Sequence, residues 1–168
     1  AGTNTWDITG ADAGDVTDIG SFSGIGNLFG GSGADTFNIA SGATLTGDIN
    51  GSTGTDSITQ ADGANTWDIT GADSGDVTDI GSFASIENLT GGTGDDTFNI
   101  ASGATLTGDI TGGTGSDTIT QADGANTWDI STANAGDVTD IGSFSSIENL
   151  TGGTGDDTFN IASGATLT

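Results

Sequence analysis

Aspartates recur along the chain at a spacing that is suited to binding metal ions. Consecutive members of the series are separated by 20 or 21 residues. The better aligned members are Asp35, Asp56, Asp96, Asp117 and Asp157, and the less regular members are Asp15, Asp76 and Asp137. If successive turns stack in register, their carboxylates lie ~5 Å apart. Two unit charges at that distance repel by about 3 kcal/mol at an effective dielectric constant of ~20.

A calcium ion between neighbouring turns would relieve this repulsion. Ca²⁺ takes about 6–8 oxygen ligands from carboxylates and main-chain carbonyls in flexible geometry, whereas Mg²⁺ demands stricter geometry and retains its waters. The alternative interpretation is that Gly and Asp are here simply ordinary turn residues. Both interpretations stay open, above all for the less regular members.

Glycine-rich turns precede the better aligned aspartates. Four turns read G-G-x-G-x-D, at 30–35, 91–96, 112–117 and 152–157, and the turn at 51–56 departs from this pattern at Ser52. Glycine allows such a turn to fold so that its carbonyls face an ion. The turn backbone expected to contribute lies near Gly31, Gly33, Gly54, Gly92, Gly94, Gly113, Gly115, Gly153 and Gly155.

These turns and the residues after them, as in GGTGDDTFN at 91–99, fit the nonapeptide G-G-x-G-x-D-x-U-x. In this respect the chain resembles RTX-like secreted proteins, and the resemblance implies calcium at these turns. The opposite turns, such as ASGATL, lack the motif. The overall texture, with SIENLTGGTGDDTF linking coils, is more similar to bacterial β-strand-repeat proteins of the surface or secreted type.

The elements that must position these turns repeat every 61 residues, as Trp6, Trp67 and Trp128 show. The repeats cover approximately 1–29 (partial), 30–90, 91–151 and 152–168 (partial), within a single array over 1–168. Apolar residues recur about every 20 residues inside each repeat. The sequence therefore predicts three coils per repeat and roughly eight coils in all.

Within each coil, short runs such as TFNI alternate apolar and polar residues, which is typical of β-strands. We therefore expect an all-β parallel β-solenoid, similar to a β-roll or β-helix, with about 20 residues per coil. Strict alternation fails between Val138 and Ile141 and again between Ile147 and Leu150, so we expect bulges or bends there.

Several other columns of the repeat are expected to be structural. The tryptophans share a column with Ile and Leu, which favours the core over a glycan-stacking platform. Gln60 and Gln121 interrupt an Ile column, so we expect them to be inward and hydrogen-bonded. A second polar column is expected to face outward as a hydrated surface, and its members are Asp7, Asn27, Asp48, Asp68, Asn88, Asp109, Asp129 and Asn149.

The composition restricts the classes of function. The chain has no Lys, Arg or His against 24 acidic residues, a formal net charge of −24. Nucleic acid is a poor partner because no basic side chain can meet a phosphate. No apolar run is long enough to span a membrane. His, Cys, Lys, Arg and Tyr are absent, and no acidic position is unique within the repeat, so we expect no enzyme.

These observations predict a structural protein, secreted or on the cell surface and bacterial in origin. We expect a calcium-stabilised fibre, filament or adhesin stalk, which associates end to end or forms part of a longer chain. Calcium coupled to folding suits secretion, because the polyanion would fold only where calcium is abundant. The alternative is a binding module that presents a glycan- or ice-binding surface on the same solenoid.

Overall fold

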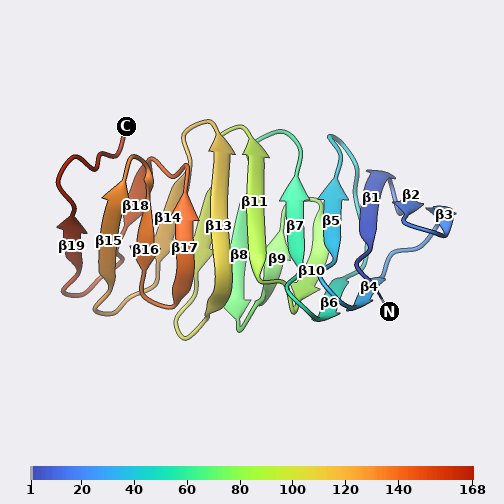
Figure 1. Ribbon diagram of the computed structural model, residues 1–168, viewed down its shortest axis with the longest axis horizontal. Coiled ribbons are helices and arrows are strands. Elements are labelled where there is room, and N and C mark those ends of the chain that lie inside the picture. The colour runs from blue at the N-terminus through green and yellow to red at the C-terminus, as the bar shows by residue number, and fades with distance from the viewer. Residues whose placement is uncertain (1) are drawn as a thin grey trace.

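The computed structural model describes residues 2–168, which form two β-sheets and contain no helix. The molecule is elongated, with the two termini at opposite ends (Figure 1). The larger sheet has the order β19 (Thr158–Ile161), β15 (Thr127–Thr132), β16 (Ala135–Val138), β17 (Ile141–Ser145), β13 (Leu106–Thr114), β11 (Asn88–Thr93), β7 (Ser57–Gln60), β5 (Thr36–Ile39), β1 (Thr5–Gly10), β2 (Ala13–Val16) and β3 (Gly20–Ser23). The smaller sheet has the order β18 (Asn149–Thr151), β14 (Thr118–Gln121), β12 (Thr97–Ile100), β8 (Thr66–Gly71), β9 (Ser74–Val77), β10 (Ile80–Ala84), β6 (Ile49–Thr53) and β4 (Leu28–Ser32). The all-β prediction is confirmed.

The chain alternates between the two sheets. It crosses at β3–β4, β4–β5, β5–β6, β6–β7 and β7–β8, which is an odd number of crossings per 61-residue repeat. Consequently β1 lies in the larger sheet, its counterpart β8 in the smaller sheet, and the next counterpart β15 in the larger sheet again. Successive repeats therefore present the same residues on opposite faces of the molecule.

The strand register departs from the expected uniform coil of about 20 residues. Cross-strand partners are 21, 31 or 34 residues apart, and only the first separation agrees with that coil length. The longer separations arise because each repeat contains an antiparallel meander, β1–β2–β3, β8–β9–β10 or β15–β16–β17, which remains within one sheet. The bulge expected between Val138 and Ile141 is confirmed by a register irregularity between β16 and β17.

The core lies between the sheets and is filled by the inward residues of each strand. Trp67 and Trp128 are fully buried, which confirms their core assignment. Trp67 stacks on Phe98 with ring centroids 5.6 Å apart and meets Phe83 edge-on at 6.3 Å. Offset and edge-to-face pairs of this kind add to the stabilisation from buried area. The core thus links strands from neighbouring repeats.

Both inward glutamines are hydrogen-bonded, as expected. Gln60 and Gln121 are each 5% exposed. Their Nε2 atoms donate to the carbonyls of Thr78 at 2.8 Å and Thr139 at 2.7 Å. Each glutamine therefore holds the start of the loop between the second and third strands of a meander against the neighbouring coil.

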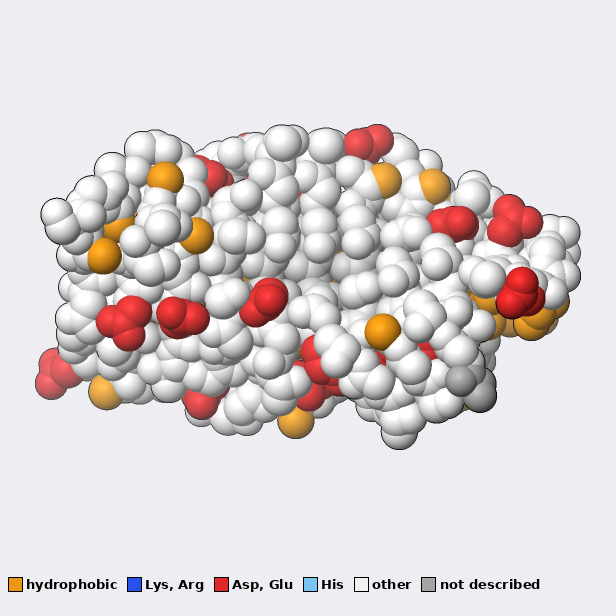
Figure 2. All heavy atoms as spheres, viewed as in Figure 1, with side chains coloured by type: hydrophobic (Ala, Val, Ile, Leu, Met, Phe, Trp, Pro, Cys, Tyr) orange, Lys and Arg blue, Asp and Glu red, His pale blue; other side chains and the backbone are white. Residues whose placement is uncertain are grey.

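The surface carries acidic side chains along its length, as the face in Figure 2 shows. The second polar column is outward as expected, with seven members exposed and Asn88 half-buried. No helix among residues 2–168 has the length and apolar character needed to cross a bilayer.

Candidate metal centre: the carboxylate ladders

Four aspartates of the glycine-rich turns point into the molecule. Asp35, Asp56, Asp96 and Asp117 are at most 1% exposed. Each precedes an inward core residue by two positions, as Asp96 precedes Phe98. Because side chains alternate across a strand, residues two apart share a face. The strand periodicity therefore directs these carboxylates inward.

Hydrogen bonds connect these aspartates across adjacent coils into two ladders. The N-terminal ladder consists of Asn4, Asp35, Asp56 and Glu87, and the central ladder consists of Asn65, Asp96, Asp117 and Glu148. In each, a carboxylate accepts the main-chain N–H of the preceding rung. The N-terminal distances are 2.7, 2.7 and 2.6 Å, and the central distances are each 2.8 Å. A charged acceptor makes such bonds stronger than neutral ones.

The two ladders belong to different sheets. The N-terminal ladder precedes β1, β5, β7 and β11, and the central ladder precedes β8, β12, β14 and β18. Parallel strands of the two sheets run in opposite directions, as the arrows of β11 and β8 show (Figure 1). The ladders therefore lie at opposite edges of the molecule. A third ladder begins where the Asn126 N–H donates to Asp157 at 3.0 Å.

One oxygen of each buried carboxylate lacks a hydrogen-bond partner. These atoms are Oδ2 of Asp35, Asp56, Asp96 and Asp117. Each lies against a glycine: a Cβ added at Gly30 would be 2.5 Å from Asp35 Oδ2 and 2.9 Å from the Gly51 carbonyl oxygen. The same pair of groups, carboxylate and next-rung carbonyl, surrounds Gly51, Gly91 and Gly112. A carboxylate oxygen and a carbonyl oxygen therefore converge at each of these turns.

Burial makes these carboxylates resist ionisation. Desolvation raises the pKa of Asp56, Asp96 and Asp117 above the ordinary range, although the hydrogen bonds that they accept act in the opposite direction. Neighbouring carboxylates add to the rise, as Asp96 does for Asp117. A cation would favour the charged form of each group.

The ladders fit a hard cation through a mixed set of ligands. Among residues 2–168, no three acidic side chains gather closely enough to hold a metal by themselves. A cation at the turns would therefore combine one unpartnered carboxylate oxygen per rung with main-chain carbonyls. Ca²⁺ accepts such a set, and it is found with carbonyl as well as carboxylate ligands.

The glycines predicted to shape the turns all have positive φ. The angles range from 81° to 152° at Gly31, Gly33, Gly54, Gly92, Gly94, Gly113, Gly115, Gly153 and Gly155. L-residues rarely adopt this region. Ser52, the departure from the motif, is nevertheless held there with a φ of 76°.

The single eight-membered column expected from the spacing is not formed. Asp35 and Asp56 are adjacent rungs of one ladder, Asp96 and Asp117 are adjacent rungs of the other, and Asp157 meets Asn126. The remaining members, Asp15, Asp76 and Asp137, are exposed on the outer faces. Each directly precedes an inward valine, so it points away from the core.

The sequence argument missed the rungs that are not aspartate. Asn4 and Asn65 stand two residues before a tryptophan, the same offset as Asp35 before Phe37. Glu87 likewise stands two residues before Leu89. Aligning the turns on the inward residue, rather than on aspartate, would have found these rungs.

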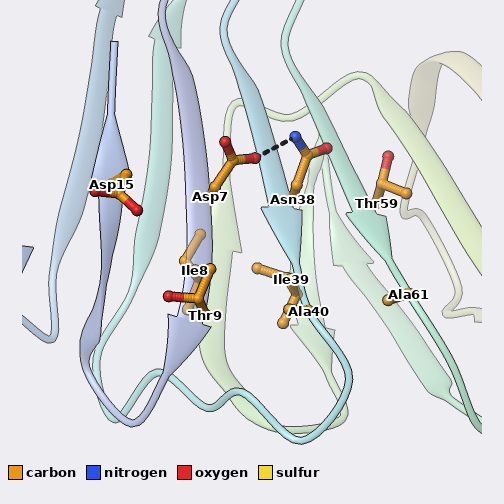
Figure 3. Close-up of a pocket in the computed structure, with 9 residues that line it drawn as sticks. All are labelled: Asp7, Ile8, Thr9, Asp15, Asn38, Ile39, Ala40, Thr59 and Ala61. Carbon is orange, nitrogen blue, oxygen red and sulfur yellow. Dashed lines mark hydrogen bonds between the residues drawn. The ribbon is translucent and has the colours of Figure 1, made fainter. Parts of the chain in front are cut away.

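The exposed aspartates border a shallow trough on the outer face. In Figure 3, Asp7, Asn38 and Thr59 form a row across adjacent strands, with Asp15 on the next strand. The Asn38 Nδ2 donates to Asp7 at 2.7 Å. The trough has a volume of about 370 Å³ and recurs at two further places, where the equivalent bonds are Asn99 to Asp68 and Asn160 to Asp129.

No family model, no curated protein and no solved structure matches the chain.

Proposed function

We propose that the chain is part of a secreted or cell-surface, bacterial, calcium-stabilised fibre, filament or adhesin stalk. The observation that carries the proposal is the rung at each repeat junction. Asp56 donates its main-chain N–H to Glu87 at 2.6 Å, and Asp117 donates to Glu148 at 2.8 Å. Because Glu87 and Glu148 each belong to the following repeat unit, every ladder joins one repeat to the next.

Alternation between two sheets supports a solenoid architecture for this fibre. Each strand pairs with strands from neighbouring coils, so stability comes from the stacking of neighbours. The larger sheet has eleven strands, which at ~4.8 Å per step span about 48 Å. The same pairing rule would continue in a longer chain or between subunits that meet end to end.

The charge balance supports a calcium requirement. The sequence contains 24 acidic residues and no basic ones, so solvent must supply the compensating cations. Buried, unpartnered carboxylate oxygens in RTX-like turns are the groups that would benefit most from an ion. Metal binding would then contribute directly to folding. We propose no catalytic role.

Electron microscopy with and without Ca²⁺ tests this proposal. Rods or filaments are expected in calcium and should shorten or disappear when a chelator is added. Mg²⁺ at equal concentration serves as the matched ionic control. Compact particles that are indifferent to both calcium and chelator would overturn the proposal.

The recurring trough favours glycan binding as the second candidate function. Carboxylate, amide and hydroxyl groups line it in Asp7, Asn38 and Thr59, and these groups can hydrogen-bond sugar hydroxyls. A glycan array tests this candidate. Ice binding has less support, because Thr93 pairs with Thr114 and Ser32 with Thr53, but these two pairs lie on different sheets.

A further inference from the structure

A second class of polar site lies at the turn with the sequence ADGAN. A pocket of about 190 Å³ is lined by Gln121, Asp123, Asn126 and Asp140, together with backbone of residues 101–103. Three turns meet there, those joining β12 to β13, β14 to β15 and β16 to β17 (Figure 1). Gln121 and Asn126 are 5% and 8% exposed. The pocket is thus built on two buried amide side chains.

Both amides use their nitrogen atoms inside the protein. Gln121 Nε2 donates to the Thr139 carbonyl at 2.7 Å, and Asn126 Nδ2 donates to the Gly152 carbonyl at 2.9 Å. A side-chain amide has one nitrogen and one oxygen. The oxygen is therefore the group that each amide has left to offer a ligand.

The other polar side chains of the pocket are carboxylates. Asp123 accepts the main-chain N–H of Thr154 at 2.9 Å, and the hydrogen bonds from Thr154 lower its pKa. Asp140 has a left-handed backbone, with φ of 69°. No basic residue exists anywhere in the sequence to neutralise them. A sugar would require donors as well as acceptors, whereas this set of side-chain oxygens suits a cation.

The same arrangement recurs one repeat earlier, on the opposite face. Gln60 is 5% exposed and donates to the Thr78 carbonyl at 2.8 Å. Asn65 is 5% exposed and donates to the Gly91 carbonyl at 3.2 Å, while Asp79 again has a φ of 69°. Two independent copies with matching contacts indicate a designed feature of the repeat.

We propose that each ADGAN turn binds one Ca²⁺ ion, separately from the glycine-rich turns of the ladders. The expected ligands of the better defined copy are Gln121 Oε1, the Asp123 and Asp140 carboxylates, main-chain carbonyls and water. Ca²⁺ accepts side-chain amide, carboxylate, carbonyl and water oxygens together. The pocket has room for the ion with part of its hydration shell. Such an ion would tie three successive turns together.

Calorimetric titration of the full chain with CaCl₂, after removal of metal by chelator, tests the site. Asp140→Asn and Asp79→Asn should each weaken one class of site by at least about tenfold, and the double variant should lose both. Asn tolerates the left-handed region, so the fold is retained. Asp18→Asn is the matched control: Asp18 has the same place in its repeat and a φ of 65°, but the chain contains no glutamine turn to face it.

Two results would overturn the proposal. One is a double variant that binds calcium with unchanged stoichiometry and affinity. The other is an equal loss of binding in Asp18→Asn, which would indicate a diffuse charge effect. Asp123→Asn, whose side chain is exposed, provides a second route to the same site if Asp140→Asn fails to fold. Variants of Asp96 report on the ladder separately, so failure of one calcium proposal leaves the other testable.

Discussion

Asp96 and Asp76 belong to the same sequence column but have opposite environments. Asp96 is fully buried and accepts the Asn65 main-chain N–H at 2.8 Å. Asp76 is exposed and lies opposite Asp68 on the neighbouring antiparallel strand. The inward residue follows Asp96 by two positions and Asp76 by one. A shift of one residue therefore moves a carboxylate from the interior to solvent.

The difference shows what burial does to an acidic residue in this protein. In the ladders, aspartates connect coils, are desolvated and retain one unpartnered oxygen. On the outer face, they remain hydrated and face another carboxylate. Variants at the two kinds of position should consequently respond differently to volume, hydrogen bonding, pH and salt.

The largest effect is expected from Gly112→Ala. A Cβ at this position would overlap the Ser146 carbonyl and contact the Asp117 carboxylate. Overpacking against backbone should lower the free energy of unfolding by about 3 kcal/mol in urea titrations. Gly10→Ala is the control, since its nearest neighbour would be the Ala13 Cβ at 3.9 Å. Equal losses in both variants would contradict the packing of the ladder turn.

A second effect separates the hydrogen bond from the charge. In chelator, Asp117→Ala should be less stable than Asp117→Asn by about 2 kcal/mol, because alanine leaves the Asp96 N–H without its acceptor. The same two substitutions at exposed Asp137 should differ by no more than about 0.5 kcal/mol. Urea unfolding measures both pairs, and an equal difference at the two positions would count against the ladder.

Stability in the absence of calcium should rise as pH falls from neutral towards the ordinary pKa of aspartate. The folded-state pKa of Asp56, Asp96 and Asp117 is raised, so their contribution is complete below the unfolded pKa and is lost as pH rises through the folded pKa. Asp→Asn changes at these residues should flatten the profile, and Asp76→Asn should not. With calcium bound, acid should instead destabilise the protein by displacing the ion.

The smallest effect is expected on the outer face. Asp76→Asn removes a like charge facing Asp68 and should stabilise the fold by about 0.2–1 kcal/mol at low ionic strength. Salt should diminish the gain because exposed charges are screened. Thermal unfolding at low and high salt measures it, and a gain independent of salt would argue against simple repulsion.

Residue patterns were sufficient to predict the all-β class, the buried tryptophans, and the inward glutamines. They also identified Asp35, Asp56, Asp96 and Asp117 as residues of special turns. They did not predict that partners such as Trp6 and Phe37 would be 31 residues apart. That register depends on the meanders that remain in one sheet, and a column of similar residues carries no information on which strand pairs with which.

Thermal unfolding of the wild type and of Asp96→Asn plus Asp117→Asn, with Ca²⁺ or chelator, tests the central claim most directly. At about a hundredfold excess over the dissociation constant, calcium should raise the wild-type midpoint by about 5 °C or more. The double variant should lose much of this rise, because the central ladder no longer supplies charged ligands. A wild-type midpoint that calcium leaves unchanged, or a rise fully preserved in the variant, would contradict a calcium role for the carboxylate ladders.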